Sequence, residues 1–149
     1  MKILLAVDDS PCSEAAVQAV IAQFRPGDAE ISVFHSVELP SALIFAAETA
    51  SAEDLAELRD GAVRAAEALV SRVAKTLKTA GFAVSKFIEP GAPKDAILDY
   101  AGKWHPDLIV VGSHGRKGLD RLLLGSVADG VARHATTAVQ IVRPRQPAV

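Results

Sequence analysis

Runs of apolar residues recur along the chain at the length of β-strands. The runs at 3–7 and 107–111 are continuous, and the segment 82–88 alternates apolar and polar residues. Continuous apolar runs of this length are typical of strands buried on both faces of a sheet. The pattern predicts strands at 3–7, 31–37, 82–88, 107–111 and 138–142.

Helical periodicity fills the intervals between these runs. Ser10 and Pro11 open a first helix, because serine caps a helix and proline fits its first turn. A turn at 26–28 ends that unit. Ser51 and Asp54 form a capping box before a long helix that ends at Gly81. Its predicted inward face is Leu55, Leu58, Ala62, Ala65, Leu69, Val73 and Leu77. After a turn at 90–93, shorter helices are predicted at 94–104, with Ala96, Ile97, Tyr100 and Ala101 inward, and at 126–134.

The alternation of buried strands with helices predicts an α/β fold. A mostly parallel sheet should carry helices on both faces. A length of 149 residues suits one domain, 1–149, with a frayed tail from about residue 144. Ligands of such sheets bind beyond the carboxyl ends of the strands, where the strand order reverses. Two of these ends bear notable residues: Asp8 follows the first strand and Gly112 follows the fourth.

Composition narrows the choice of partners and compartment. The net charge is −2 and no long basic stretch occurs, so neither nucleic acid nor a membrane surface is an expected partner. No apolar run approaches the length of a membrane span or a signal-peptide core. The single cysteine, Cys12, fits a reducing compartment. A soluble cytoplasmic protein is therefore expected.

The segment 38–50 does not fit either periodicity. Leu39, Leu43, Ile44 and Phe45 make it too apolar for a plain solvated loop. Two interpretations stay open at this point. The segment is either a flap over a binding site or part of a contact with a partner.

A glycine-rich loop at 112–126 leaves the fourth strand and opens the last helix. Glycines let the backbone approach a ligand closely, and successive backbone N–H groups can bind an anion. The helix that begins near Gly125 adds a positive dipole end. Arg116, Lys117 and Arg121 make the loop positive, and Ser126 adds a hydroxyl. The loop suits a polyphosphate, although it matches neither the P-loop nor the Gly-x-Gly-x-x-Gly pattern. The alternative is a tight connector whose glycines only serve turns.

Few other residues are candidates for ligand binding, metal binding or catalysis. Asp8 is either a ligand-binding carboxylate or a turn former, and Asp9 is expected to be solvated. The four histidines are scattered without metal-ligand spacing, and we expect His114 to make a structural hydrogen bond. No nucleophile–base motif and no paired catalytic carboxylates are recognisable. No catalytic residue is therefore assigned.

The chain nevertheless resembles a known family. The spacing of Gly112, Gly115, Gly125 and Ser126 is similar to the ATP-binding motif of universal stress proteins. The resemblance extends over nearly the whole chain. It begins with the first strand, which leads to Asp8 and then Ser10, and it ends with Arg143 and Pro144. It implies a doubly wound five-stranded sheet of order 3-2-1-4-5, of the adenine nucleotide alpha hydrolase type. In that order the first and fourth strands are neighbours, so Asp8 and Gly112 would face one crevice.

The resemblance also implies a ligand, its contacts and a dimer. ATP would bind with Mg²⁺ or Mn²⁺ on its phosphates, and Asp8 would hold either ribose or that cation. Ser36 stands where most members carry valine, at a main-chain contact to adenine. The implied contact residues are Ala6, Val7, Asp8, Ser36, Val111, Gly112, Gly115, Arg116, Gly125, Ser126 and Val127. The apolar strand Ala138–Val142 would pair with its copy in a twofold homodimer.

We therefore expect a nucleotide-dependent regulatory module of the stress response, read by a downstream protein. Two alternatives remain at this stage. One is a slow ATPase or phosphoryl-transfer enzyme that uses Asp8, a metal and Arg116. The other is an interaction or chaperone-like module that does not use nucleotide.

Overall fold

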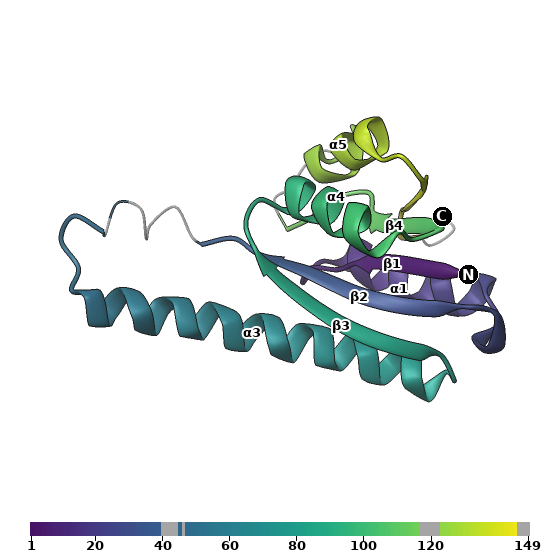
Figure 1. The fold of residues 1–149 in the computed structure, drawn as a ribbon, viewed down its shortest axis with the longest axis horizontal. Coiled ribbons are helices and arrows are strands. Elements are labelled where there is room, and N and C mark those ends of the chain that lie inside the picture. Colours follow the sequence, from purple (N-terminus) through teal and green to yellow (C-terminus); the bar gives the residue numbers. More distant parts are fainter. Residues whose placement is uncertain (40–44, 46, 117–122, 146–149) are drawn as a thin grey trace.

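Five parallel strands form a single sheet with helices on both faces (Figure 1). The computed structural model describes residues 1–39, 45, 47–116 and 123–145. In chain order the elements are β1 (Lys2–Ala6), α1 (Pro11–Gln23), the 3-10 turn η1 (Pro26–Asp28), β2 (Glu30–Val37), α3 (Ala52–Thr79), β3 (Ala83–Pro90), α4 (Pro93–Trp104), β4 (Leu108–Gly112), α5 (Ser126–His134) and β5 (Ala138–Val142). The strand order β3-β2-β1-β4-β5 confirms the predicted topology.

Two apolar layers sandwich the sheet. Successive side chains of a strand point to opposite faces, so β1 contributes to both layers. Ile3 and Leu5 pack under α1 and α3, whereas Leu4 packs under α4 and α5. All three are fully buried. This explains why the central strands read as continuous apolar runs rather than as alternating ones.

The predicted helix signals act as expected. The Ser10 side chain caps α1 by accepting the N–H of Ser13, and Pro11 lies in the first turn. Ser51 and Asp54 form the capping box of α3. Gly81 follows α3 with φ of 97°, a conformation that favours glycine. The bounds of β5 match the prediction, and those of the other strands differ from it by at most two residues. Asp107, for example, precedes β4 because its carboxylate accepts the N–H of Lys2.

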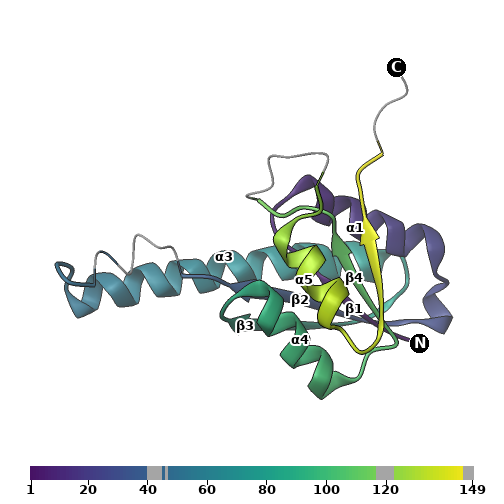
Figure 2. The same cartoon turned by 90° about the horizontal axis from the view of Figure 1, so that it is seen from above.

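The predicted inward face of the long helix is wrong in its first half. Leu58 is 53% exposed and Ala65 is exposed, and the buried residues of α3 begin only at Ala66. The helix has 28 residues, about 42 Å, whereas an eight-residue strand spans only about 27 Å. The amino-terminal half of α3 therefore extends beyond the sheet, as Figures 1 and 2 show.

The segment 38–50 is only partly described. Leu39 is 43% exposed and Phe45 is 82% exposed. Residues 40–44 and 46, which include Leu43 and Ile44, lie outside the described residues. Across the described part of the chain, no helix is both long and apolar enough to span a bilayer.

A buried hydroxyl pair ties β2 to α4. Ser32 Oγ and Tyr100 Oη lie 2.9 Å apart, and both residues are buried. Replacing Tyr100 with phenylalanine leaves the Ser32 hydroxyl without this partner, so we expect a loss of about 1–2 kcal/mol in the free energy of unfolding. Urea denaturation checks this value. The double variant Ser32→Ala/Tyr100→Phe should lose less than the sum of the single variants, and additive losses would contradict the coupling.

Candidate functional site

A hollow opens at the carboxyl ends of β1 and β4. These neighbouring strands lead to helices on opposite faces, α1 after β1 and α5 after β4, so the winding reverses between them. The hollow is lined by Ala6, Val7, Asp8, Ser13, Phe34, His35, Ser36, Pro93, Ile97, Val111, Gly112, His114, Gly115 and Val127.

Most of the predicted contact residues meet in this hollow. Eight of them line it: Ala6, Val7, Asp8, Ser36, Val111, Gly112, Gly115 and Val127. Gly125 and Ser126 lie at the start of α5 without lining it, and Arg116 is exposed. Lys117 and Arg121, which were expected to add positive charge, fall outside the described residues.

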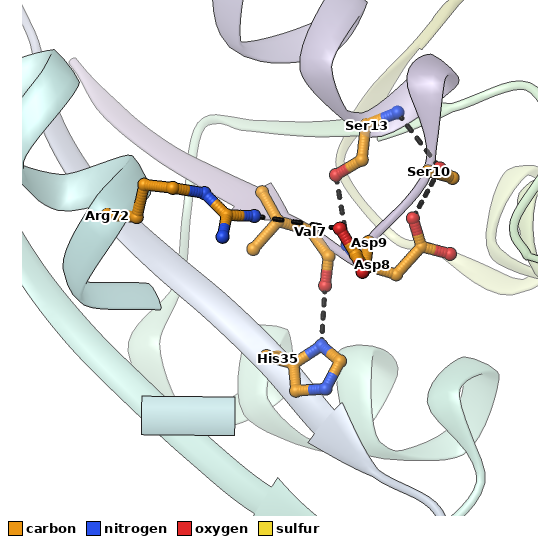
Figure 3. Close-up of polar contacts among 7 residues, drawn as sticks. All are labelled: Val7, Asp8, Asp9, Ser10, Ser13, His35 and Arg72. Atoms are coloured by element: carbon orange, nitrogen blue, oxygen red, sulfur yellow. Dashed lines mark hydrogen bonds and ion pairs between the residues drawn. The ribbon is translucent and has the colours of Figure 1, made fainter. Parts of the chain in front are cut away.

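Asp8 is held from two sides at the end of β1 (Figure 3). Its backbone N–H donates to Ser13 Oγ over 2.9 Å, and its Oδ1 accepts the hydroxyl of Ser10. Its Oδ2 faces Gly115, where an added Cβ would lie only 2.7 Å away. One carboxylate oxygen is therefore fixed by the protein, and the other lies against the backbone of the glycine loop at Gly115.

Ser10 connects three parts of the site. It caps α1 and donates to Asp8, and its Oγ also lies 3.4 Å from the carbonyl oxygen of His114. The sequence pattern identified Ser10 only as a helix cap. Its second role depends on the loop after β4 folding back against α1, which a local pattern does not encode.

Glycines bring backbone segments into direct contact around the hollow. A Cβ on Gly112 would lie 2.8 Å from the backbone carbon of Cys12, in the first turn of α1. A Cβ on Gly125 would lie 2.8 Å from the carbonyl oxygen of Ser113, which accepts the Gly125 N–H. Gly125 is the N-cap of α5, and no side chain of the described residues caps that helix. Its first N–H groups are therefore available to an anion.

His114 makes structural hydrogen bonds, as predicted. Its Nδ1 lies 3.1 Å from Ser113 Oγ, and its Nε2 contacts the carbonyl oxygen of Leu123. The imidazole thus joins the two described ends of the glycine-rich loop. Asp9, expected to be solvated, is exposed and lies 3.6 Å from Arg72 (Figure 3).

The sequence pattern missed Phe34 and His35 of β2, although the family resemblance implied a contact at Ser36 beside them. His35 Nδ1 bonds the carbonyl oxygen of Val7 over 2.7 Å (Figure 3), and Phe34 also lines the hollow. Ser36 Oγ donates to the carbonyl oxygen of Gly91 over 2.5 Å, so its side chain fixes the turn before α4. Only their position at the carboxyl end of the second strand could have identified Phe34 and His35.

The described residues contain no cluster of three or more His, Cys, Asp or Glu side chains that could bind a metal. A divalent cation at Asp8 would therefore need ligands from the bound molecule or from water. Asp8 fits that role with one available carboxylate oxygen.

The strand order and the position of the hollow define a doubly wound α/β protein with a crevice at its switch point. The chain belongs to the universal stress protein family, because the model of that family matches residues 1–143.

Sequence and structure comparisons agree with this assignment. Universal stress protein MJ0531 of Methanocaldococcus jannaschii is 31% identical over 142 residues, which cover 95% of this chain and 81% of that protein. The solved structure of protein MJ0577 has a TM-score of 0.83 and 27% identity, with 98% of this chain and 97% of that chain covered. A universal stress protein solved in complex with cAMP has a TM-score of 0.63 and 25% identity, with 96% of each chain covered.

Proposed function

We propose that this protein binds ATP in the hollow between β1 and β4 and acts as a nucleotide-dependent regulatory module. The observation that carries the proposal is the convergence of Asp8 and Gly115 in the lining of the hollow, where the backbone of residue 115 lies so close to the Asp8 carboxylate that a side chain would clash with it. A similar family member forms a complex with an adenine nucleotide, cAMP, which supports an adenine nucleotide as the ligand.

The two ends of the hollow differ in chemistry. Val111, Val127 and Ile97 provide an apolar surface for a base, and Ser36 offers its backbone there. On the other side, the amino terminus of α5 and the hydroxyl of Ser126 suit phosphate oxygens. This polarity supports a ligand whose base lies on the apolar residues and whose phosphates lie toward the first N–H groups of α5.

Asp8 sets a condition on how the phosphates bind. A carboxylate only accepts hydrogen bonds and repels a bare phosphate. Its Oδ2 must therefore meet either a ribose hydroxyl or a cation such as Mg²⁺ or Mn²⁺ that the phosphates bind. Both arrangements use the oxygen that Ser10 leaves available.

Regulation would use the elements attached to the hollow. The β2 end leads directly into the segment 38–50. On the other side, the N–H of Ser113 donates to the carbonyl oxygen of Val142 over 2.8 Å, which ties the glycine loop to the end of β5. The edge position of β5 supports the proposed homodimer through Ala138–Val142. Nucleotide binding would thus change the conformation of the segment 38–50 and of the β5 edge, the two surfaces that a partner protein could recognise.

Titration calorimetry with ATP, with and without Mg²⁺, tests the proposal. We expect one site per chain and an affinity about tenfold weaker in Asp8→Ala, because a hydrogen bond or cation contact of the carboxylate is lost. Asp9→Ala is the matched control, since the adjacent carboxylate is exposed and lies outside the hollow.

Asp8→Asn distinguishes the two roles of the carboxylate. If Asp8 holds the cation, this variant loses the effect of Mg²⁺ on affinity. If it holds ribose, the Mg²⁺ effect stays. A wild-type protein that does not bind ATP at millimolar concentration would contradict the proposed function.

A further inference from the structure

The outer face of α3 carries two groups of opposite charge. The groups contain three acidic and three basic side chains at matched spacing, all exposed: Asp54, Glu57 and Asp60, and Arg72, Lys75 and Lys78. Each basic residue follows its acidic counterpart by 18 residues, which is five turns of about 3.6 residues. Both groups therefore lie on the same face of the helix, about 27 Å apart. That face is opposite the buried stripe that begins at Ala66.

Local helix energetics explain this segregation only in part, because Asp60 and Arg64 are the one favourable acid–base pair at a spacing of four residues that involves these six side chains. Like charges three residues apart destabilise a helix by about 0.2–0.5 kcal/mol per pair. The helix dipole favours acids in the first turn and bases in the last turn, so it accounts for Asp54 and Lys78 only. In the described residues Arg72 contacts Asp9 at 3.6 Å, and no ion pair is formed by Glu57, Asp60, Lys75 or Lys78.

We infer that α3 pairs with α3 of a second copy of this chain, antiparallel across a twofold axis near residue 66. A twofold interface uses the same surface on both copies. With the axis there, Asp54, Glu57 and Asp60 meet Lys78, Lys75 and Arg72 of the second copy, in that order. A single antiparallel register brings all three pairs together, because the two residues of each pair lie equally far from the axis, on opposite sides of it. Near the axis, Arg64 of one copy lies close to Glu67 of the other.

The shape of the helix supports this pairing. Gly61, Ala65 and Ala68 separate the two charged groups and permit close approach of two helices. A Cβ on Gly61 would meet only the guanidinium of Arg64, at 3.9 Å. The acidic half is the part that extends beyond the sheet, so it is free to lie along another molecule (Figures 1 and 2).

The basic half offers a matching recess. A hollow between α3 and β3 is lined by Ser71, Ala74, Lys75, Lys78, Thr79 and Lys86. The ammonium group of Lys86 lies 3.1 Å from Ser71 Oγ and adds a third positive charge. The acidic end of a second copy is complementary to this recess in charge. This surface lies at the β3 side of the sheet, away from the β5 edge, so the two interfaces are independent.

Two charge-reversed variants test the pairing. Glu57→Lys/Asp60→Lys leaves Asp54 as the one acidic side chain of the six, and Arg72→Glu/Lys75→Glu leaves Lys78 as the one basic side chain. Each variant alone should associate through α3 at least about tenfold more weakly than wild type, because like charges then face each other. A mixture of the two should regain the lost affinity, because every pair is again of opposite sign. Analytical ultracentrifugation at low salt, with one variant fluorescently labelled, measures all three cases.

The controls separate this interface from other effects. Asp95→Lys/Asp99→Lys on α4 changes the net charge as much as Glu57→Lys/Asp60→Lys and should associate like wild type. Pairing through β5 contributes equally to complexes of one variant and to complexes of both variants. Only stronger association of the mixture than of either variant alone therefore supports pairing through α3. Recovery on mixing also rules out misfolding as the cause of the loss. The inference is overturned if either variant alone associates like wild type, or if the mixture gains nothing.

Discussion

Replacing Gly115 with valine is expected to lower the affinity for ATP by about 100-fold or more, a loss of about 2.7 kcal/mol. A Cβ at this position would lie 2.7 Å from Asp8 Oδ2, and Asp8 cannot simply turn away. Its other oxygen and its backbone N–H are held by Ser10 and Ser13. The valine therefore both fills the proposed cradle and displaces the carboxylate that faces it. Calorimetric titration with ATP and Mg²⁺ measures the loss.

The stability of this variant should change little. Gly115 is exposed, and the main cost is the hydrogen bond between Asp8 and Ser10, so the free energy of unfolding should fall by no more than about 1 kcal/mol. Gly27→Val is the control, because a Cβ there meets no atom within 4 Å and the residue is far from the hollow. Binding that survives in Gly115→Val would contradict the placement of the ligand beside this glycine. Equal losses in both variants would point to a general effect of valine.

Much of the fold follows from local signals in the sequence. The buried strands are continuous apolar runs because both faces of the sheet are covered, and Ser10, Ser51 and Gly81 mark helix ends for reasons of local hydrogen bonding and backbone conformation. The burial of α3 could not be predicted in the same way. Its apolar spacing runs the full length of the helix, but the sheet ends before the helix does, and strand length is a property of the whole fold.

The candidate site, too, could be predicted from the sequence only in part. Glycine spacing and the position of Asp8 after a strand were visible because they belong to contiguous motifs. The contributions of His35, Ile97 and the Ser10 hydroxyl arise only when β2, α4 and the loop after β4 converge. These contacts join residues distant in sequence, and no spacing rule connects them. The strand order implied by the family resemblance supplied the one long-range fact, the adjacency of β1 and β4.

Gly112→Val is expected to destabilise the fold by about 3 kcal/mol, the upper end of the cost of overpacking. A Cβ at Gly112 would lie 2.8 Å from both the backbone carbon and the Cβ of Cys12, and 2.9 Å from its carbonyl oxygen. These atoms belong to the first turn of α1, so no side-chain rotation relieves the contact. The helix must shift away from β4, and α1 packs on both β4 and β5. Urea denaturation monitored by circular dichroism measures the loss.

Gly61→Ala is the opposing control for this prediction. Gly61 lies inside α3 with open space around its Cα, so alanine should raise the free energy of unfolding by about 0.5–1 kcal/mol through helix propensity. Opposite signs at two glycines would show that close backbone approach, rather than glycine content, determines the effect. Truncating the Cys12 side chain to alanine should not rescue Gly112→Val, because the Cβ and backbone of residue 12 remain in place. Full rescue by Cys12→Ala would instead assign the clash to the thiol and contradict the backbone contact between β4 and α1.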